Sequence, residues 1–146
     1  MKIMFVCTAN TCRSVMAEAI FKHIANENFE VFSSGIIAEN GKKPSNNAIE
    51  VCNSHAIDLS GCRATYFKDS MIAEMDLVLT LEEFHKEKIR IYYPDLKILT
   101  IREFIGEYPH DINDPFGGDI KVYDACFFEI YRCLKKVMQK LQSTSE

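Results

Sequence analysis

The 146-residue sequence contains no apolar run that approaches the length of a membrane span. A helix that crosses a bilayer needs roughly 20 consecutive apolar residues. The opening run Ile3–Val6 is too short even for the core of a signal peptide, and polar residues follow it. Positive charge is not in excess either, because the net charge is -4, whereas a basic surface is the usual mark of a nucleic-acid-binding protein. We therefore expect a cytoplasmic protein with neither a membrane nor a nucleic acid as its partner.

Motifs that would indicate a metal site or a disulfide framework are also missing. Six cysteines stand at positions 7, 12, 52, 62, 126 and 133, without a CxxC pair or a Cys/His cluster of the zinc type. A chain of this length without an export signal is expected to keep its thiols reduced. The sequence therefore predicts no metal ion and no cofactor, and most of the cysteines are expected to be small buried apolar groups.

The chain is long enough to bury a core as one domain, and its apolar pattern changes period along the sequence. Short apolar runs typical of buried strands occupy residues 2–6, 30–33, 76–80 and 97–99. Helices are predicted at 13–27, 44–54 (with Pro44 in its first turn), 67–73, 81–91 and 120–141, and an irregular stretch at 106–118. Strands that alternate with helices favour one α/β domain over residues 1–146, built on a parallel sheet with helices on both faces.

A loop that can carry chemistry joins the first predicted strand to the first predicted helix. It reads CTANTCRS over residues 7–14, a Cys-x5-Arg-Ser pattern, and ligands of open α/β sheets bind at this end of the strands. Such a loop can wrap a phosphate with backbone N–H groups while the helix N-terminus points at the anion. Arg13 can bind two phosphate oxygens through its planar guanidinium. The same positive field favours the thiolate of Cys7 by lowering its pKa. The sequence therefore predicts a nucleophile at Cys7 and a phosphate clamp at Arg13.

The other residues of this loop have supporting roles in the prediction. Ser14 can hydrogen-bond the thiolate or stabilise it as a leaving group. Asn10 can brace the loop from within, because asparagine tolerates turn conformations. The predicted phosphate-binding residues of the loop are Thr8, Ala9, Asn10, Thr11, Cys12 and Ser14.

A thiolate nucleophile also needs a group that protonates the leaving group. The best candidate is Asp114, which is followed by Pro115, Phe116 and two glycines that give the loop shape or mobility. An Asp-Pro pair is also a common turn signal, and taken alone the turn would explain it. Together with Cys7 and Arg13, we interpret Asp114 as the general acid. Phe116 would line the substrate cleft, although packing within the turn explains it almost as well.

With these motifs in place, nearly the whole chain resembles the low-molecular-weight protein tyrosine phosphatase family. The resemblance begins with VCTANTCRS at 6–14 and MAE at 16–18, and it continues through SSG at 33–35, DLVL at 76–79 and DPF at 114–116. It implies a four-stranded parallel sheet flanked by helices, a phosphorylated protein as substrate, and a metal-free reaction in two steps. Cys7 would attack phosphorus while Asp114 protonates the leaving group. Asp114 would then activate the water that hydrolyses the phosphocysteine. We expect a monomer that self-associates weakly at most.

The resemblance also implies redox protection of the nucleophile. In relatives, the cysteine at the position of Cys12 forms a reversible disulfide with the nucleophile. Both cysteines lie on one loop here, so the pair Cys7 and Cys12 is expected to behave in the same way. The alternative is that Cys12 is a plain packing residue.

One branch of the family removes phosphate from protein arginine instead of tyrosine. The chain looks like that branch at Thr8, at Thr11 and in DPFGG at 114–118. Tyrosine-selective members usually carry a bulkier aliphatic residue where Thr11 stands. The smaller Thr11 would leave room for a guanidinium group, with which Asp114 could pair. At this point the sequence leaves the choice between phosphotyrosine and phosphoarginine open.

The chain departs from the family pattern at three places. Ala9 replaces a usual glycine, which would strain the loop if this residue needs a positive φ. Val15 replaces a usual proline at the helix start. A histidine that braces the loop in many relatives is absent near Gly61-Cys62. None of these changes removes a catalytic group, so they concern rate and selectivity.

Two other functions compete with a phosphatase. An arsenate reductase of related fold shares the Cys-x5-Arg loop but needs extra cysteines to relay a disulfide, and this chain has none between Thr80 and Tyr108. A non-catalytic phosphopeptide-binding module would use the loop only as an anion cradle. Such a module would be expected to have lost Cys7 or Asp114, and both are present. The sequence therefore favours a phosphoprotein phosphatase that works through a phosphocysteine.

Overall fold

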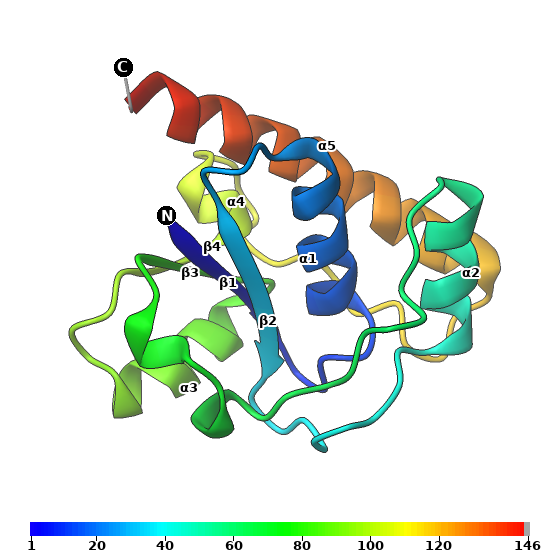
Figure 1. Ribbon diagram of the computed structural model, residues 1–146, viewed down its shortest axis with the longest axis horizontal. Helices are drawn as coiled ribbons and strands as arrows, with labels where there is room; N and C mark the ends of the chain where they lie inside the picture. The colour runs from blue at the N-terminus through cyan, green and yellow to red at the C-terminus, as the bar shows by residue number, and fades with distance from the viewer. Residues whose placement is uncertain (145–146) are drawn as a thin grey trace.

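The computed structural model describes residues 1–144 and has one parallel sheet with helices on both faces (Figure 1). The strands are β1 (Lys2–Cys7), β2 (Glu30–Gly35), β3 (Leu77–Thr80) and β4 (Ile98–Thr100), in the order β2-β1-β3-β4. The helices are α1 (Arg13–Ile24), α2 (Asn46–Ser54), α3 (Glu83–Tyr92), α4 (Ile101–Phe104) and α5 (Ile120–Thr144). This arrangement confirms the predicted fold class. Within residues 1–144, no helix is both long and apolar enough to cross a bilayer.

The two faces of the sheet bury different sets of apolar side chains. Successive residues of a strand point to opposite faces. Ile3 and Phe5 of β1 therefore pack in the cluster that includes α1 and α5, whereas Met4 and Val6 pack in the cluster that includes α3. All four side chains are at most 1% exposed. Burial on both faces explains why the sequence of β1 is a continuous apolar run.

The predicted helix at 44–54 begins too early, the one at 67–73 is not a single helix, and the other three differ from the structure by one to three residues at their ends. α2 begins at Asn46, and its N-cap is Ser45, whose hydroxyl accepts the N–H of Ala48 at 3.2 Å. A serine at the N-cap satisfies an N–H group that has no partner within the helix, and this favours a helix start after Ser45. Pro44 therefore precedes the helix and does not lie in its first turn. The helix predicted at 67–73 is instead two separate 3-10 turns, Phe67–Asp69 and Ile72–Glu74.

The short helix α4 is absent from the sequence-based prediction. It is fixed by a reciprocal pair of hydrogen bonds at its start. The Thr100 hydroxyl accepts the N–H of Glu103 at 2.9 Å, and the Glu103 carboxylate accepts the N–H of Thr100 at 3.1 Å. This Thr-x-x-Glu pattern is a known signature of a helix N-terminus, so the sequence contained a signal for α4.

The sheet has a topological switch point next to β1. The next strand along the chain, β2, pairs with one edge of β1, and β3 pairs with the opposite edge of β1. Val6 near the end of β1 is in register with Thr80 at the end of β3. Ligands of open parallel sheets bind at such a point, beyond the carboxyl ends of the strands. Residues that follow β1 and β3 are therefore expected to meet at a binding site.

Candidate active site

A cavity of about 200 Å³ lies beyond the carboxyl end of β1. It is formed by two parts of the chain that are far apart in sequence. Its lining residues are Cys7, Thr8, Ala9, Thr11, Cys12, Arg13, Asp114 and Phe116. The predicted nucleophile, phosphate clamp and general acid therefore share one cavity. Two of the other predicted phosphate-binding residues, Asn10 and Ser14, do not line the cavity. Their side chains are buried on the far side of the loop, 1% and 0% exposed.

Asn10 braces the loop through all the polar groups of its side chain. Its φ of 58° lies in the left-handed region, which asparagine tolerates better than most residues. The amide Nδ2 donates to Ser14 Oγ at 2.7 Å and to Ser33 Oγ at 3.0 Å. Its Oδ1 accepts the N–H of Thr65 at 2.9 Å. The Thr65 contact fixes which end of the amide is oxygen, so Asn10 holds the loop in one orientation.

The strain predicted for Ala9 is not found. Among the non-glycine residues of the range 1–144, only Asn10 and Ala56 have a positive φ. The left-handed residue of the loop is therefore its asparagine, and an alanine is compatible with position 9. The backbone conformation of Ala9 therefore gives no reason to expect a slower enzyme.

Cys7 is the last residue of β1 and is 3% exposed. Its Sγ lies 2.9 Å from Ser14 Oγ and accepts the Ser14 backbone N–H at 3.4 Å. Ser14 Oγ accepts a hydrogen from Asn10, and it can donate its own hydrogen either to Sγ or to the Ser34 carbonyl at 3.3 Å. A thiolate is the stronger acceptor of the two, because it is charged. Ser14 is therefore placed to stabilise the ionised form of Cys7.

Opposing effects act on the ionisation of Cys7. Burial is the largest effect and raises the pKa of the Cys7 thiol, whereas the charge of Arg13 and hydrogen bonds from Ser14 lower it. The balance leaves the pKa above its ordinary value, so the expectation of a lowered pKa is wrong in direction. The motif identifies the groups that favour a thiolate, and these groups are present. It does not show how deeply β1 buries the sulfur, and burial disfavours the charged form.

The first prediction concerns Ser14→Ala. A hydrogen bond to a charged group contributes about 1.5–3 kcal/mol, and about 1.4 kcal/mol corresponds to one pH unit. Removing the hydroxyl is therefore expected to raise the pKa of Cys7 further, by about 1 to 2 pH units. The measurement is the pH dependence of Cys7 alkylation by iodoacetamide, followed by mass spectrometry. Ser54→Ala, which alters a serine on α2 outside the cavity, is the control, and an unshifted midpoint in Ser14→Ala would remove this role from the hydroxyl.

Arg13 is positioned by a carboxylate and a carbonyl. Its side chain is 2% exposed, and Nη1 donates to Glu82 Oε2 at 2.7 Å and to the Ile112 carbonyl at 2.8 Å. Nη2 lies 3.6 Å from Asp114 Oδ2. The guanidinium is therefore held from two sides, by the junction of β3 with α3 and by the loop that precedes α5. A clamp fixed in this way does not have to be ordered when a phosphate binds.

Glu82 is a residue of the site that belongs to no sequence motif. It lies just after β3, the strand that pairs with β1. The rule that ligands bind beyond the carboxyl ends of strands is a signal that could have found it. The Cys-x5-Arg motif covers only the loop after β1, which holds the predicted nucleophile and clamp. The residue that positions Arg13 follows the neighbouring strand, β3.

Asp114 forms a turn and also lines the cavity, so both interpretations of the Asp-Pro pair describe it. Its Oδ1 accepts the N–H of Phe116 at 3.0 Å, as in a turn. Its Oδ2 faces Arg13, and the side chain remains 46% exposed. The turn therefore directs one carboxylate oxygen to the cavity. Phe116 is 80% exposed and forms part of the cavity lining, so it is not packed within the turn.

Cys12 is a buried free thiol that faces polar side chains. Its Sγ donates to Ser45 Oγ at 3.4 Å and lies 3.4 Å from the hydroxyl of Tyr123. Burial raises the pKa of Tyr123 to about 12, and the contact with Cys12 adds to this. Tyr123 is therefore a neutral hydroxyl group beside Cys12. A disulfide between Cys7 and Cys12 stays a prediction, in which the Cys12 thiol would have to leave these two partners.

One group of potential metal ligands lies outside this cavity. Glu83, Glu103 and His110 place one ligand atom each within 4.8 Å of one another. The ammonium group of Lys86 lies 3.2 Å from Glu83 and 3.0 Å from Glu103. A cation already pairs with both carboxylates, so we interpret the group as an ion-pair cluster at the start of α3. The sequence placed His110 far from other histidines but did not predict its contact with these acids.

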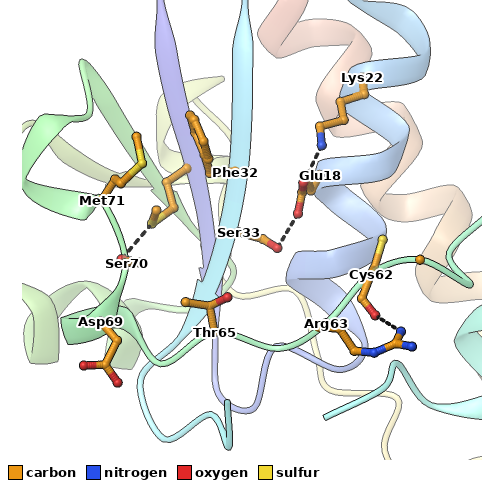
Figure 2. A pocket seen from close by; sticks show the side chains of 12 residues that line it. Glu18, Lys22, Phe32, Ser33, Cys62, Arg63, Thr65, Asp69, Ser70 and Met71 are labelled. Atoms are coloured by element: carbon orange, nitrogen blue, oxygen red, sulfur yellow. Dashed lines mark hydrogen bonds and ion pairs between the residues drawn. The ribbon is translucent and has the colours of Figure 1, made fainter. Parts of the chain in front are cut away.

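A second cavity, of about 470 Å³, lies beside the outer edge of β2 (Figure 2). Its charged side chains include Glu18 and Lys22, which pair with each other at 2.6 Å. Ser33 donates to Glu18 at 2.5 Å, as Figure 2 shows. Ser33 and Thr65 of this lining also hold Asn10. Residues that line the larger cavity therefore support the loop at 7–14 from behind, and the smaller cavity contains Cys7, the predicted nucleophile.

Known proteins are similar to this chain over nearly its whole length. The sequence model described as low molecular weight phosphotyrosine protein phosphatase matches residues 2–146. A protein-arginine-phosphatase of Geobacillus stearothermophilus is 35% identical over 144 residues, covering 97% of each chain. The low molecular weight protein-tyrosine-phosphatase PtpB of Staphylococcus epidermidis is 32% identical over 141 residues, covering 96% of this chain and 99% of that protein.

A solved structure is similar over the same extent. It is described as a mutant of the YwlE arginine phosphatase in which an active site serine that replaces a cysteine is phosphorylated. It superimposes with a TM-score of 0.92 at 34% sequence identity, and the match covers 97% of this chain and 96% of that chain.

Proposed function

This chain belongs to the low molecular weight phosphotyrosine protein phosphatase family, and we propose that it removes phosphate from arginine side chains of proteins. The chain is a phosphoprotein phosphatase, a hydrolase whose substrates are phosphorylated proteins. The proposal adds the residues that carry out the reaction and the side chain from which the phosphoryl group is removed. The observation that carries it is that Thr11 and Asp114 line the same cavity as Cys7 and Arg13.

The proposed reaction has two steps at phosphorus. Cys7 Sγ attacks the phosphoryl group, the bond from phosphorus to the leaving group breaks, and Asp114 donates a proton to the leaving atom. Asp114 then removes a proton from a water molecule, which attacks the phosphocysteine and releases inorganic phosphate and the Cys7 thiolate. Arg13 and the backbone N–H groups of the loop bind the phosphoryl oxygens throughout. Ser14 stabilises Cys7 both as nucleophile and as leaving group.

The choice of phosphoarginine depends on the wall of the cavity. Thr11 is a small side chain, so it leaves space beside the carboxylate of Asp114. An arginine leaving group carries a guanidinium that can pair with this carboxylate, whereas a phenol ring has no such charge. The names of the relatives do not decide the matter, since members of both classes are about equally similar to this chain. The phenyl ring of Phe116 favours the alternative substrate, phosphotyrosine, because it could stack on an aromatic ring.

The test compares two substitutions of Thr11. Thr11→Ile adds bulk, and Thr11→Val removes the hydroxyl with little change of volume. We expect Thr11→Ile to lower the ratio of kcat/KM for a phosphoarginine protein to that for a phosphotyrosine peptide by about 10-fold or more. Thr11→Val should change this ratio much less. A wild-type enzyme that prefers phosphotyrosine, or equal ratios in Thr11→Ile and wild type, would refute the phosphoarginine assignment.

Two coarser features of the protein complete the proposal. We propose a cytoplasmic location, because a thiol nucleophile next to a second cysteine needs reducing surroundings. We also propose that the enzyme acts as a monomer. One chain supplies every residue assigned to the reaction, from the loop at 7–14 and from the loop at 114–116.

A further inference from the structure

A buried histidine that the reaction scheme does not use contacts the phosphate loop. His85 lies in the first turn of α3 and is 0% exposed. Its Nδ1 accepts the backbone N–H of Glu82 at 3.1 Å, and its Nε2 lies 2.9 Å from Oγ1 of Thr8. Thr8 is the residue after Cys7 and lines the cavity. One histidine ring therefore connects the junction of β3 and α3 to the loop that surrounds the phosphate.

These two contacts fix the tautomer of His85. A backbone N–H can only donate, so Nδ1 must carry a lone pair, and the proton of the neutral ring is on Nε2. Burial lowers the pKa of His85 to about 3, and the charge of Arg13 acts in the same direction. The charged groups that face the ring are Arg13 and the Glu82 carboxylate, whose Oε2 lies 3.7 Å from Nε2. The ring is therefore neutral at neutral pH, with a hydrogen on Nε2.

The tautomer determines the orientation of the Thr8 hydroxyl. Because Nε2–H donates to Oγ1, the hydroxyl accepts on that side and its own hydrogen must point elsewhere. We propose that His85 is a positioning residue that fixes the Thr8 hydroxyl as a hydrogen-bond donor to the phosphoryl group of the substrate. This inference rests on the proposed function of the cavity but not on the choice between phosphoarginine and phosphotyrosine.

A fixed donor at this place suits the reaction. Negative charge is spread over the three equatorial oxygens of a phosphoryl group during transfer. A threonine hydroxyl with no neighbour could turn a lone pair toward these oxygens and would then repel them. With His85 in place, the hydroxyl hydrogen cannot be used up in a bond to the ring, because Nε2 already carries a hydrogen, so it remains available to the phosphoryl oxygens. The same turn of the chain positions Arg13 through the Glu82 carboxylate, so the junction of β3 and α3 orients two donors for one substrate group.

The test is a double-mutant cycle with p-nitrophenyl phosphate as substrate. The variants are Thr8→Val, His85→Phe and the combination of both. We expect each single change to lower kcat/KM by about 10-fold, as for the loss of one hydrogen bond to a charged group. If His85 acts through Thr8, the double variant should be no slower than Thr8→Val. Losses that multiply, to about 100-fold in the double variant, would overturn the proposal.

Two further measurements separate positioning from a loss of structure. A glutamine amide can accept from the Glu82 N–H and donate to Thr8, so His85→Gln should recover most of the activity that His85→Phe loses. Inhibition by inorganic phosphate should weaken in His85→Phe and in Thr8→Val by the same factor. Thermal unfolding of each variant shows whether the fold is kept. If His85→Phe does not fold, the comparison of His85→Gln with Thr8→Val carries the same test, since Gln should be active where Val is not.

The tautomer itself can be measured without any activity. Nitrogen-15 NMR of the wild-type histidines should find His85 neutral, with its proton on Nε2, and unchanged between pH 5 and pH 8. A proton on Nδ1 would overturn the inference directly. An inactive wild type would contradict the proposed function, whereas an active wild type with multiplicative losses would contradict only the role of His85.

Discussion

Cys7→Ser should abolish hydrolysis of p-nitrophenyl phosphate while the fold and the phosphate site remain. A serine hydroxyl at this position keeps the contact with Ser14, but it is a far weaker nucleophile than a thiolate. We expect kcat to fall by a factor on the order of 10⁵ to 10⁶, the loss seen when other enzymes lose their nucleophile. Phosphate binding should persist, because Arg13 and the loop N–H groups are unchanged. Steady-state kinetics and calorimetric titration with inorganic phosphate measure the two quantities.

The matched control is Cys62→Ser, which alters a partly exposed cysteine in the cavity beside β2. It should retain nearly full activity. If Cys7→Ser kept a tenth of the wild-type rate, Cys7 would not be the nucleophile. If wild type were inactive but still bound phosphate, the chain would be an anion-binding module. These outcomes separate loss of chemistry from loss of binding.

Asp114→Asn should slow the reaction according to how much the leaving group needs a proton. Asparagine keeps the size of the side chain and can still accept the N–H of Phe116, so the turn should be preserved. Loss of a general acid costs typically 10²- to 10⁴-fold. For p-nitrophenol, which is a good leaving group, the expected loss lies near the lower limit. For phosphoarginine and phosphotyrosine it should be about 10-fold larger or more.

The control for Asp114→Asn is Asp119→Asn, which makes the same change of charge in the same loop. Asp119 accepts the N–H groups of Lys121 and Val122 at the start of α5, a contact that asparagine can also make. It does not line the cavity, so its substitution should leave kcat nearly unchanged. If both variants lost the same activity on all leaving groups, the effect of Asp114 would be one of net charge and not of proton transfer.

The strands, and the residues that meet in the cavity, could be predicted from sequence because each rests on a local pattern. β1 and β3 are continuous apolar runs, since both faces of a central parallel strand are buried. Cys7 and Arg13 belong to one short motif, and Asp114 stands out by its proline and glycines. These features need no knowledge of which segments meet. Boundaries and short elements were less predictable, as the missed helix α4 shows.

The parts that escaped prediction depend on contacts between segments distant in sequence. Glu82 and His85 position Arg13 and Thr8, but they belong to no local motif, and only their place after β3 indicates that they lie near the site. The direction of the Cys7 pKa depends on how deeply the sulfur is buried, which is a property of the whole sheet. The expected strain at Ala9 failed because the left-handed conformation falls on Asn10. Local motifs therefore indicate the candidate reacting residues. The residues that hold them in place, and the depth at which they are buried, depend on the tertiary structure.

The hydrogen bond from Arg13 to the carbonyl of Ile112 spans 99 residues of sequence. It has a consequence for the growing chain during translation. A nascent polypeptide that has left the ribosome only as far as β4 already contains the nucleophile and the anion clamp. It lacks both the carbonyl that orients the clamp and the acid at position 114. Since domains generally fold as units once their sequence is available, hydrolytic activity should appear only when synthesis is nearly complete. A chain that ends at β4 would carry the Cys-x5-Arg loop but not the segments that complete the active site.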